Sequence, residues 1–247
     1  MITNSTFNPC IVIPCFNHGA TLASVISRLQ PLNLHCLVVD DGSETSSKQQ
    51  LETFCQQHPN LSLFRLEKNQ GKGAAVIRGL QEAAKLGYTH VLQVDSDGQH
   101  EIEKARDLLA LAVKHPDCLI SGRPVYDTSV PGSRLYGRYI THLLVWLETL
   151  SFSIADSMCG FRVYPIQPTL AIRRVGKRMD FDPEIMVRLY WSGTPSLFIP
   201  VKVIYPEDGI SNFRILDDNL LMIRLHIKLL LGMLWRSPRL IFRRRKS

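Results

Sequence analysis

Two aspartates separated by one residue, Asp95 and Asp97, follow an apolar run in the segment Val-Leu-Gln-Val-Asp-Ser-Asp-Gly-Gln-His at residues 91–100. Side chains along a strand alternate with a period of two, so a strand that ends here presents both carboxylates on one face. Two hard oxygen ligands at a sheet edge suit Mg²⁺ or Mn²⁺ carrying a diphosphate. Acidic pairs also occur in ordinary turns, so the function of this pair depends on its neighbours.

Two earlier apolar runs also end in residues that suit a ligand: Ile-Pro-Cys-Phe-Asn at 13–17 and Val-Val-Asp-Asp-Gly-Ser at 38–43. In open parallel sheets, ligands bind outside the carboxyl ends of the strands. The residues expected at this edge are Pro14, Asn17, Asp40, Asp41, Asp95 and Asp97. Acidic strand ends gathered at one edge repel each other, which favours a bound ligand over a purely structural role.

A glycine-rich turn, Gly71-Lys72-Gly73, opens a predicted helix. Such a turn could offer backbone N–H groups to a phosphate. It has neither the spacing of a P-loop nor a dinucleotide fingerprint, because Val76 stands where the third glycine would be. An ordinary helix start is the alternative interpretation.

The elements around these motifs alternate between apolar runs and amphipathic stretches. The predicted strands are 10–13, 34–39, 61–66, 90–94, 118–121 and 196–203, and the predicted helices are 21–29, 47–58, 71–86, 101–114 and 182–191. This rhythm predicts an α/β fold with a mostly parallel sheet flanked by helices. Pro14 is expected to end the first strand, and Thr21 to cap the first helix.

The composition favours one substantial domain with a basic surface. The chain has 247 residues, of which 45% are hydrophobic, and a formal net charge of +7. Such a charge fits nucleic acid, an anionic membrane or a phosphorylated substrate. Nucleic acid is not expected, because the basic residues crowd one apolar-flanked tail and no nucleic-acid module is recognised. That tail contains Arg236, Arg239, Arg243, Arg244, Arg245 and Lys246.

The cysteines and the first residues indicate a cytoplasmic protein. The six cysteines (Cys10, Cys15, Cys36, Cys55, Cys118 and Cys159) form no Cys-x-x-Cys pair, and most lie in or beside apolar segments. We expect reduced core thiols rather than disulfides or a metal site. The first ten residues lack the features of a signal peptide, and no transmembrane helix is expected because charges interrupt every long apolar run.

Residues 219–235 form a long apolar segment, and we expect the helix that it predicts to end before Pro238. Arg224 and Lys228 lie four residues apart, so the segment could lie in a membrane interface with the basic tail on anionic lipid. Residues 139–152 could form a second interfacial helix. The alternative is that both pack on the domain or on another copy. We therefore divide the chain into a catalytic domain, residues 1–214, and a membrane-associating segment, residues 215–247.

The motifs described above are joined by Asn-Gln-Gly-Lys-Gly-Ala-Ala at residues 69–75. Two further motifs follow them along the chain, at residues 156–164 and 181–193. Over residues 9–215 this set resembles the family 2 glycosyltransferases with a GT-A fold. Within that family the chain looks most like the dolichol- and polyprenyl-phosphate sugar transferases. The resemblance implies a UDP- or GDP-sugar donor, a lipid-linked acceptor (a polyprenyl phosphate or a glycolipid) and Mg²⁺ or Mn²⁺. It also implies a peripheral position at the cytoplasmic face of the inner membrane, where a separate membrane protein could hold the enzyme.

The resemblance also implies roles for individual residues. In this interpretation Asp40 binds the base, Asp95 contacts the ribose or diphosphate, and Asp97 binds the metal. The donor-binding candidates are Pro14, Asn17, Asp40, Asp41, Lys72, Asp95, Ser96 and Asp97; the metal candidates are Asp95, Asp97 and Gln99; the phosphate- or acceptor-binding candidates are Arg123, Arg134, Arg138 and Arg162. Two residues or segments depart from the family pattern: His18 stands after the first motif, and Met158-Cys159-Gly160 stands before Phe161. The second departure leaves the exact acceptor open.

The chemistry implied is a single displacement with inversion at the anomeric carbon. A phosphate acceptor is already an anion, whereas a hydroxyl acceptor needs a carboxylate to take its proton. Besides Asp97, the catalytic candidates are Glu184 and Asp182, with Asp156 behind them; Glu184 could instead complement a helix dipole. Two other functions stay open: a sugar-nucleotide nucleotidyltransferase, and a catalytically silent scaffold at the membrane.

Overall fold

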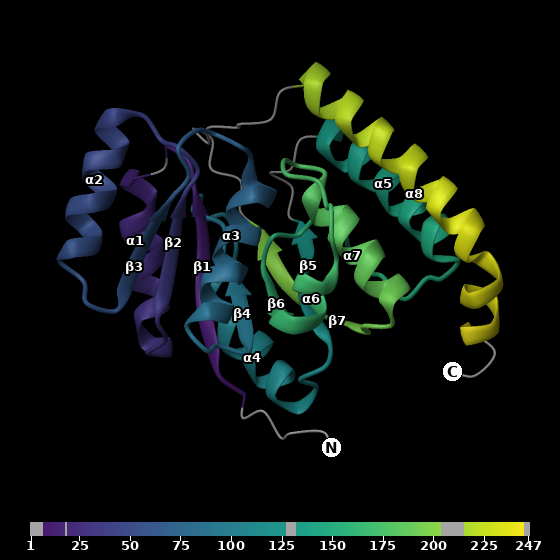
Figure 1. Ribbon diagram of the computed structural model, residues 1–247, viewed down its shortest axis with the longest axis horizontal. Helices are drawn as coiled ribbons and strands as arrows, with labels where there is room; N and C mark the ends of the chain where they lie inside the picture. The colour runs from purple at the N-terminus through teal and green to yellow at the C-terminus, as the bar shows by residue number, and fades with distance from the viewer. Residues whose placement is uncertain (1–6, 18, 127–131, 204–214, 245–247) are drawn as a thin grey trace.

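The computed structural model describes residues 7–17, 19–126, 132–203 and 215–244. They form a seven-stranded sheet in the order β3-β2-β1-β4-β6-β5-β7 (Figure 1). The strands are β1 (Pro9–Cys15), β2 (Cys36–Asp40), β3 (Leu61–Arg65), β4 (His90–Gln93), β5 (Leu119–Tyr126), β6 (Arg162–Pro165) and β7 (Ser196–Val203). Only β6 runs antiparallel to its neighbours in this described sheet. The expected mostly parallel α/β fold is therefore confirmed.

Helices cover both faces of the sheet. They are α1 (Gly19–Leu29), α2 (Thr45–Gln56), α3 (Lys72–Lys85), α4 (Ala105–Lys114), α5 (Gly132–Thr149), α6 (Ile166–Ala171), α7 (Phe181–Ser192) and α8 (Ile215–Arg244), with short 3₁₀ turns η1 (Gln30–Leu32) and η2 (Ile102–Lys104). Helices α1, α2 and α4 contribute to one hydrophobic core. Helices α3, α5, α6, α7 and α8 contribute to the other.

The central strand shows why the apolar runs are continuous. In β1, Ile11 and Ile13 point into the first core, whereas Cys10 and Val12 point into the second. Alternate side chains lie on opposite faces of a strand, and both faces here are covered by helices. Both sets of positions must therefore be apolar.

The end of β1 differs from the expectation at two points. Pro14 does not end the strand, which continues to Cys15 and pairs with β2 through Asp40. This is possible because pairing with β4 has already ended at Val12, so no ladder on that side needs the missing N–H. Thr21 is not a helix cap, since α1 begins at Gly19; its Oγ1 donates to the carbonyl of Ser96 at 2.8 Å. Helix α1 is thereby tied to the Asp-Ser-Asp turn.

The second half contains one strand that was not expected from the sequence and one that is longer than expected. Strand β6 has only four residues, too few for a pattern, and inserts antiparallel between β4 and β5. Strand β5 extends to Tyr126 rather than ending at Ser121, because β7 pairs with its whole length. The predicted strand at 196–203 is confirmed as β7.

Helix α8 also corrects an expectation, since it runs through Pro238 to Arg244. Proline removes the N–H that would bond to the carbonyl four residues earlier, here that of Leu234. The hydroxyl of Ser237 donates to this carbonyl at 2.9 Å, and so satisfies it. Within the described part of the chain, no helix has the combination of length and apolar character that spanning a bilayer requires.

The six cysteines are free thiols, and five of them are buried. Burial raises the pKa of Cys10 and of Cys36 to about 12. They pack as small hydrophobic side chains, as the sequence predicted.

Candidate active site

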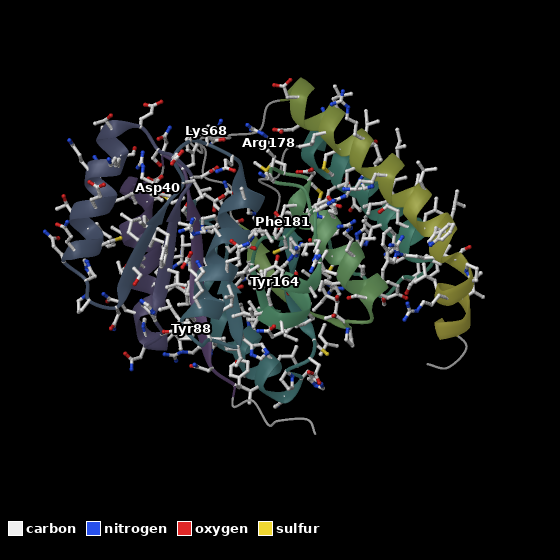
Figure 2. All side chains as sticks on the ribbon, viewed as in Figure 1. Asp40, Lys68, Tyr88, Tyr164, Arg178 and Phe181 are labelled. Carbon is white, nitrogen blue, oxygen red and sulfur yellow. The ribbon has the colours of Figure 1, made fainter. Side chains whose placement is uncertain are left out.

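The polar residues at the carboxyl ends of β1 and β2 lie side by side. Cys15 pairs with Asp40 across the two strands, and the loops beyond them are joined through Asn17. The Ser43 hydroxyl accepts a hydrogen bond from the N–H of Asn17 at 2.9 Å, and the Asn17 side chain accepts one from the N–H of Glu44 at 3.0 Å. Figure 2 shows Asp40 toward this end of the molecule and Tyr88 at the other end.

Asp40, the candidate base-binding residue, is buried and already has partners. Its Oδ1 accepts the N–H of Ser43 at 2.9 Å, and its Oδ2 forms an ion pair with Arg65. Arg65 also donates to the carbonyl of Ser43 at 2.8 Å. The carboxylate thus shapes the turn after β2, and Arg65, which the sequence analysis missed, neutralises it.

Asp41 organises the glycine-rich turn. Its two carboxylate oxygens accept the N–H groups of Gln70 and Gly71, each at 2.8 Å. Burial raises the pKa of Asp41 above its ordinary value, although these two N–H groups act in the opposite direction. The N–H of Ala74 donates to the carbonyl of Lys177 at 2.9 Å. The N–H groups of Gly71 and Ala74 therefore bind the protein itself, and a phosphate-binding role for the turn stays a prediction that concerns the other N–H groups.

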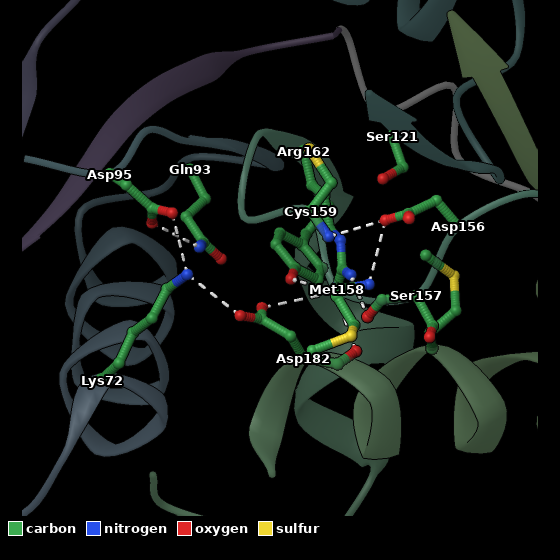
Figure 3. A network of polar contacts seen from close by, with 12 residues as sticks. Lys72, Gln93, Asp95, Ser121, Asp156, Ser157, Met158, Cys159, Arg162 and Asp182 are labelled. Atoms are coloured by element: carbon green, nitrogen blue, oxygen red, sulfur yellow. Dashed lines mark hydrogen bonds and ion pairs between the residues drawn. The ribbon is translucent and has the colours of Figure 1, made fainter. Parts of the chain in front are cut away.

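Lys72 joins three parts of the fold. Its Nζ donates to Asp95 and to Asp182, each at 2.9 Å (Figure 3). Burial would lower the pKa of Lys72, but the two carboxylates more than reverse this and raise it above its ordinary value. Burial would likewise raise the pKa of Asp95, yet Lys72 and His100 hold it below its ordinary value. The three side chains therefore form a charged cluster that links α3, the Asp-Ser-Asp turn and α7.

The other aspartate of the pair, Asp97, has a different environment. It is partly buried, and its Oδ1 accepts the N–H of Gln99 at 3.0 Å. Among the described residues no lysine or arginine forms an ion pair with it, and its electrostatic interaction is with the buried His100. Asp97 is therefore the carboxylate of the pair that is better placed to take a divalent ion, while Asp95 is held by Lys72.

The oxygen ligands around Asp97 suit the divalent metal that the sequence implied, although they are few. In the described ranges no cluster of three or more histidine, cysteine, aspartate or glutamate side chains could hold a metal ion. Mg²⁺ commonly takes only one or two protein carboxylates and fills its remaining positions with water and phosphate oxygens. Asp97, with Asp95 and Gln99 close in sequence, fits that mode.

Two residues of the same stretch were missed. Gln93, a polar side chain in a buried strand, donates through Nε2 to Asp95 at 3.2 Å. His100 is buried, and its Nε2 lies 3.6 Å from the Sγ of Cys159. Burial alone would lower the pKa of His100, but Cys159 and the carboxylates of Asp95 and Asp97 raise it to about 9. Gln93 could have been found from the sequence, because it is a polar residue within an otherwise apolar run.

Arg162, a candidate phosphate binder, is instead part of the interior. Its side chain is 0% exposed, and it donates to the carbonyls of Asp182 at 3.0 Å and Ser157 at 2.7 Å. It also donates to the hydroxyl of Tyr164 at 3.2 Å. The buried guanidinium (Figure 3) holds the residues around it in place and offers no accessible surface to an acceptor.

The other candidate arginines differ in their surroundings. Arg138 on α5 donates twice to one oxygen of Asp156, at 2.8 and 2.6 Å, and lies over the Tyr126 ring. Arg123 on β5 is exposed. The side chain of Arg134 lies outside the described part of the structure. Arg138 and Arg123 therefore stay the candidates for an anionic group.

Glu184, the first candidate base, is 1% exposed and lies in an ion-pair network. Its Oε1 accepts Lys228 of α8 at 2.7 Å, and its Oε2 accepts the N–H of Gly176 at 2.8 Å. Arg188 lies 3.3 Å from the same carboxylate. The structure brings Asp182 into the cluster with Asp95, but it directs Glu184 toward α8 and the loop before α7.

The close packing around Lys72 gives a first prediction. A methyl group at Gly160 would collide with the Asp95 carboxylate and the Lys72 ammonium. We expect Gly160→Ala to lower the free energy of unfolding by about 1–3 kcal/mol, as overpacking does, and to reduce turnover. Denaturant unfolding and a transfer assay measure the two effects. Gly137→Ala is the control, because a methyl group there meets nothing within 4 Å; equal stability of the two variants would contradict the prediction.

The sheet order, with acidic strand ends at one edge and a reversed β6, defines a GT-A fold. The family model described as "Glycosyl transferase family 2" matches residues 10–177. The chain therefore belongs to glycosyl transferase family 2, as the motifs indicated. Membership argues against the nucleotidyltransferase alternative.

Named relatives carry similar sequences over most of this chain. An undecaprenyl-phosphate mannosyltransferase from Micrococcus luteus is 26% identical, covering 81% of this chain and 85% of the relative. A dolichyl-phosphate beta-glucosyltransferase from Dictyostelium discoideum is 27% identical, covering 71% of this chain and 60% of the relative. The resemblance to lipid-phosphate sugar transferases is thereby confirmed.

A solved structure supports the fold. The mannosyltransferase PcManGT from Pyrobaculum calidifontis, in complex with GDP-Man and Mn²⁺, superposes with a TM-score of 0.55 at 18% identity, covering 83% of this chain and 59% of the other. At this identity the similarity concerns the fold alone.

Proposed function

We propose that this protein is an inverting, metal-dependent glycosyltransferase that moves a sugar from a UDP- or GDP-sugar to a lipid-linked phosphate. The reaction is a single displacement at the anomeric carbon, and we place it at the cytoplasmic face of the membrane. Relatives whose names contain undecaprenyl phosphate and dolichyl phosphate support the acceptor class.

One observation favours a phosphate over a hydroxyl acceptor. A hydroxyl must lose its proton to a base, and the candidates were Glu184, Asp182 and Asp156. Each of these carboxylates already has a cationic partner: Lys228, Lys72 and Arg138 respectively. An acceptor phosphate is already an anion and needs only to be positioned. The bidentate fork of arginine suits this task, and Arg138 and Arg123 are the residues we assign to it.

The donor side is assigned to the edge formed by β1, β2 and β4. Asp97 would hold Mg²⁺ or Mn²⁺ with help from Asp95 and Gln99. When bound, the metal neutralises the negative charge of the departing diphosphate. Lys72 fixes the orientation of Asp95, and the Thr21 hydroxyl fixes the Asp-Ser-Asp turn through the carbonyl of Ser96.

The test is release of nucleoside diphosphate from a panel of UDP- and GDP-sugars. A short-chain isoprenyl phosphate serves as acceptor, the corresponding alcohol as its matched control, and Mn²⁺ or Mg²⁺ is compared with EDTA. We expect turnover with the phosphate only, and its loss in EDTA. Turnover with the alcohol alone would refute the phosphate assignment. Donor binding without turnover would favour the silent scaffold or a missing partner, and no binding of any donor would reject the proposal.

A further inference from the structure

Helix α8 is apolar on two opposite sides. Its buried side chains, among them Leu225, Leu229 and Met233, pack toward α5 and α7. A second apolar stripe faces outward and recurs every three or four residues. It consists of Leu220, Ile223, Ile227, Leu231, Leu234 and Ile241, with Trp235 beside it at 86% exposure. A helix at the surface of a domain needs one apolar side for the core, and so the second side lacks a partner in the described structure.

Helix α5, which packs beside α8, repeats this arrangement (Figure 1). Its exposed apolar residues are Tyr136, Tyr139, Ile140, Leu143 and Leu147, and Phe152 follows in the next loop. The buried side chains of α5, such as Val145 and Glu148, pack in the opposite direction. We call the exposed apolar residues of α5, α8 and Phe152 the α5–α8 face. Exposed apolar side chains that gather on two helices packed together indicate an interaction site.

The charges around this face favour a bilayer. From residue 219 to residue 241, α8 contains no aspartate or glutamate, and its Arg224 and Arg239 are exposed. Two further cations, Lys228 and Arg236, contact Glu184 and Trp191 of the domain. The one acidic residue of α5, Glu148, is 0% exposed and is paired with His226. Two copies of such a face would repel each other, whereas an anionic lipid surface attracts both its apolar and its basic groups. The exposed Tyr136, Tyr139 and Trp235 of this face suit the level of the headgroups.

Helix α5 also connects this face to the acceptor side of the site. Arg138 points inward to Asp156, while the residues next to it, Tyr139 and Ile140, are exposed on the α5–α8 face. We infer that the α5–α8 face docks on the surface of an anionic bilayer and brings α5 down to the headgroups, so that a lipid-linked phosphate reaches Arg138 from the membrane. This inference rests on the proposed function for the acceptor, but docking itself is measured without one.

The test is flotation of the purified protein with phosphatidylcholine vesicles, with and without phosphatidylglycerol and with no acceptor lipid present. The variant Ile227→Glu/Leu231→Glu places two carboxylates in the middle of the face. The control, Leu86→Glu/Val113→Glu, makes the same change at two exposed apolar residues elsewhere on the surface. Thermal unfolding shows that each variant is folded, and light scattering reports its oligomeric state. A second variant, Arg224→Gln/Arg239→Gln, removes two charges from the face and keeps its apolar stripe.

We expect wild type and the control to float with the anionic vesicles and the Ile227→Glu/Leu231→Glu variant to stay unbound. The Arg224→Gln/Arg239→Gln variant should bind several-fold more weakly. Transfer to a water-soluble, short-chain acceptor should be equal in all four proteins. Absence of wild-type binding, equal binding of the double-glutamate variant, or a dimer that this variant dissolves would overturn the inference. Vesicle binding without any transfer would leave docking supported and would count against the proposed function alone.

Discussion

Replacing Asp97 by asparagine is expected to reduce sugar transfer about 10²- to 10³-fold, because the site would lose the carboxylate that we propose holds the metal, and with it the cation that would neutralise the departing diphosphate. Asparagine retains an Oδ1 that can accept the N–H of Gln99, so the turn should keep its shape. The measurement is steady-state release of nucleoside diphosphate, with Mn²⁺ affinity determined by calorimetry in the presence of the nucleotide.

The control for this variant is Asp107→Asn, which neutralises an exposed aspartate on α4 that pairs with Lys104. It should leave transfer and Mn²⁺ affinity unchanged. If Asp97→Asn turned over like wild type at saturating Mn²⁺, the assignment of Asp97 as the principal metal ligand would be wrong.

Replacing Lys72 by methionine is expected to have the largest effect on stability. It leaves Asp95 and Asp182 facing each other across a mostly buried cluster without their shared cation. Removing one partner of a buried ion pair costs about 3–5 kcal/mol. The guanidinium of Arg162, 3.5 Å from Asp182, stays in place, but Asp95 and Asp182 no longer share a cation. Denaturant unfolding should show this loss, and transfer should fall with it, since Asp95 is no longer held.

The exposed Lys68, four residues earlier, provides the matched control: Lys68→Met should change stability little. The double variant Lys72→Met/Asp182→Asn, which removes one of the two facing carboxylate charges, should recover part of the loss, since residues in one network are not additive. A Lys72→Met protein as stable as wild type would show that the cluster does not stabilise the fold.

The edge that carries the donor-binding candidates could be predicted because it depends on local pattern. Apolar runs that end in Asp40 and Asp95 identify strand ends, and parallel strands bring their carboxyl ends together. The helix starts were also close to the expectation, since they follow glycine and polar residues. These features need no knowledge of contacts between distant segments.

The partners of the acidic residues could not be predicted in the same way. Lys72 and Asp182 lie 110 residues apart, and only the reversed strand β6 and the packing of α7 bring them together. Arg162 resembled a phosphate binder because an arginine in a motif is usually exposed. Its burial follows from its place between Tyr164 and Asp182, which no local pattern reveals. The expected end of the last helix at Pro238 was wrong for a similar reason. The hydroxyl of Ser237 donates to the Leu234 carbonyl, which the missing N–H of proline leaves without its usual partner.

Lys228 has a consequence for how the chain can be divided. It reaches from α8 to Glu184, which in turn holds the N–H of Gly176 in the loop that packs on Gly71 and Gly73. Helix α8 therefore supports the loop that packs on the glycine-rich turn, as well as carrying an outward face. A shortened protein ending at residue 214 would lose a cation that Glu184 uses and the cover over Trp191, which Gly232 and Arg236 contact. Helix α8 is thus packed into the framework around α7, and we expect a protein shortened to residue 214 to be less stable than the full chain.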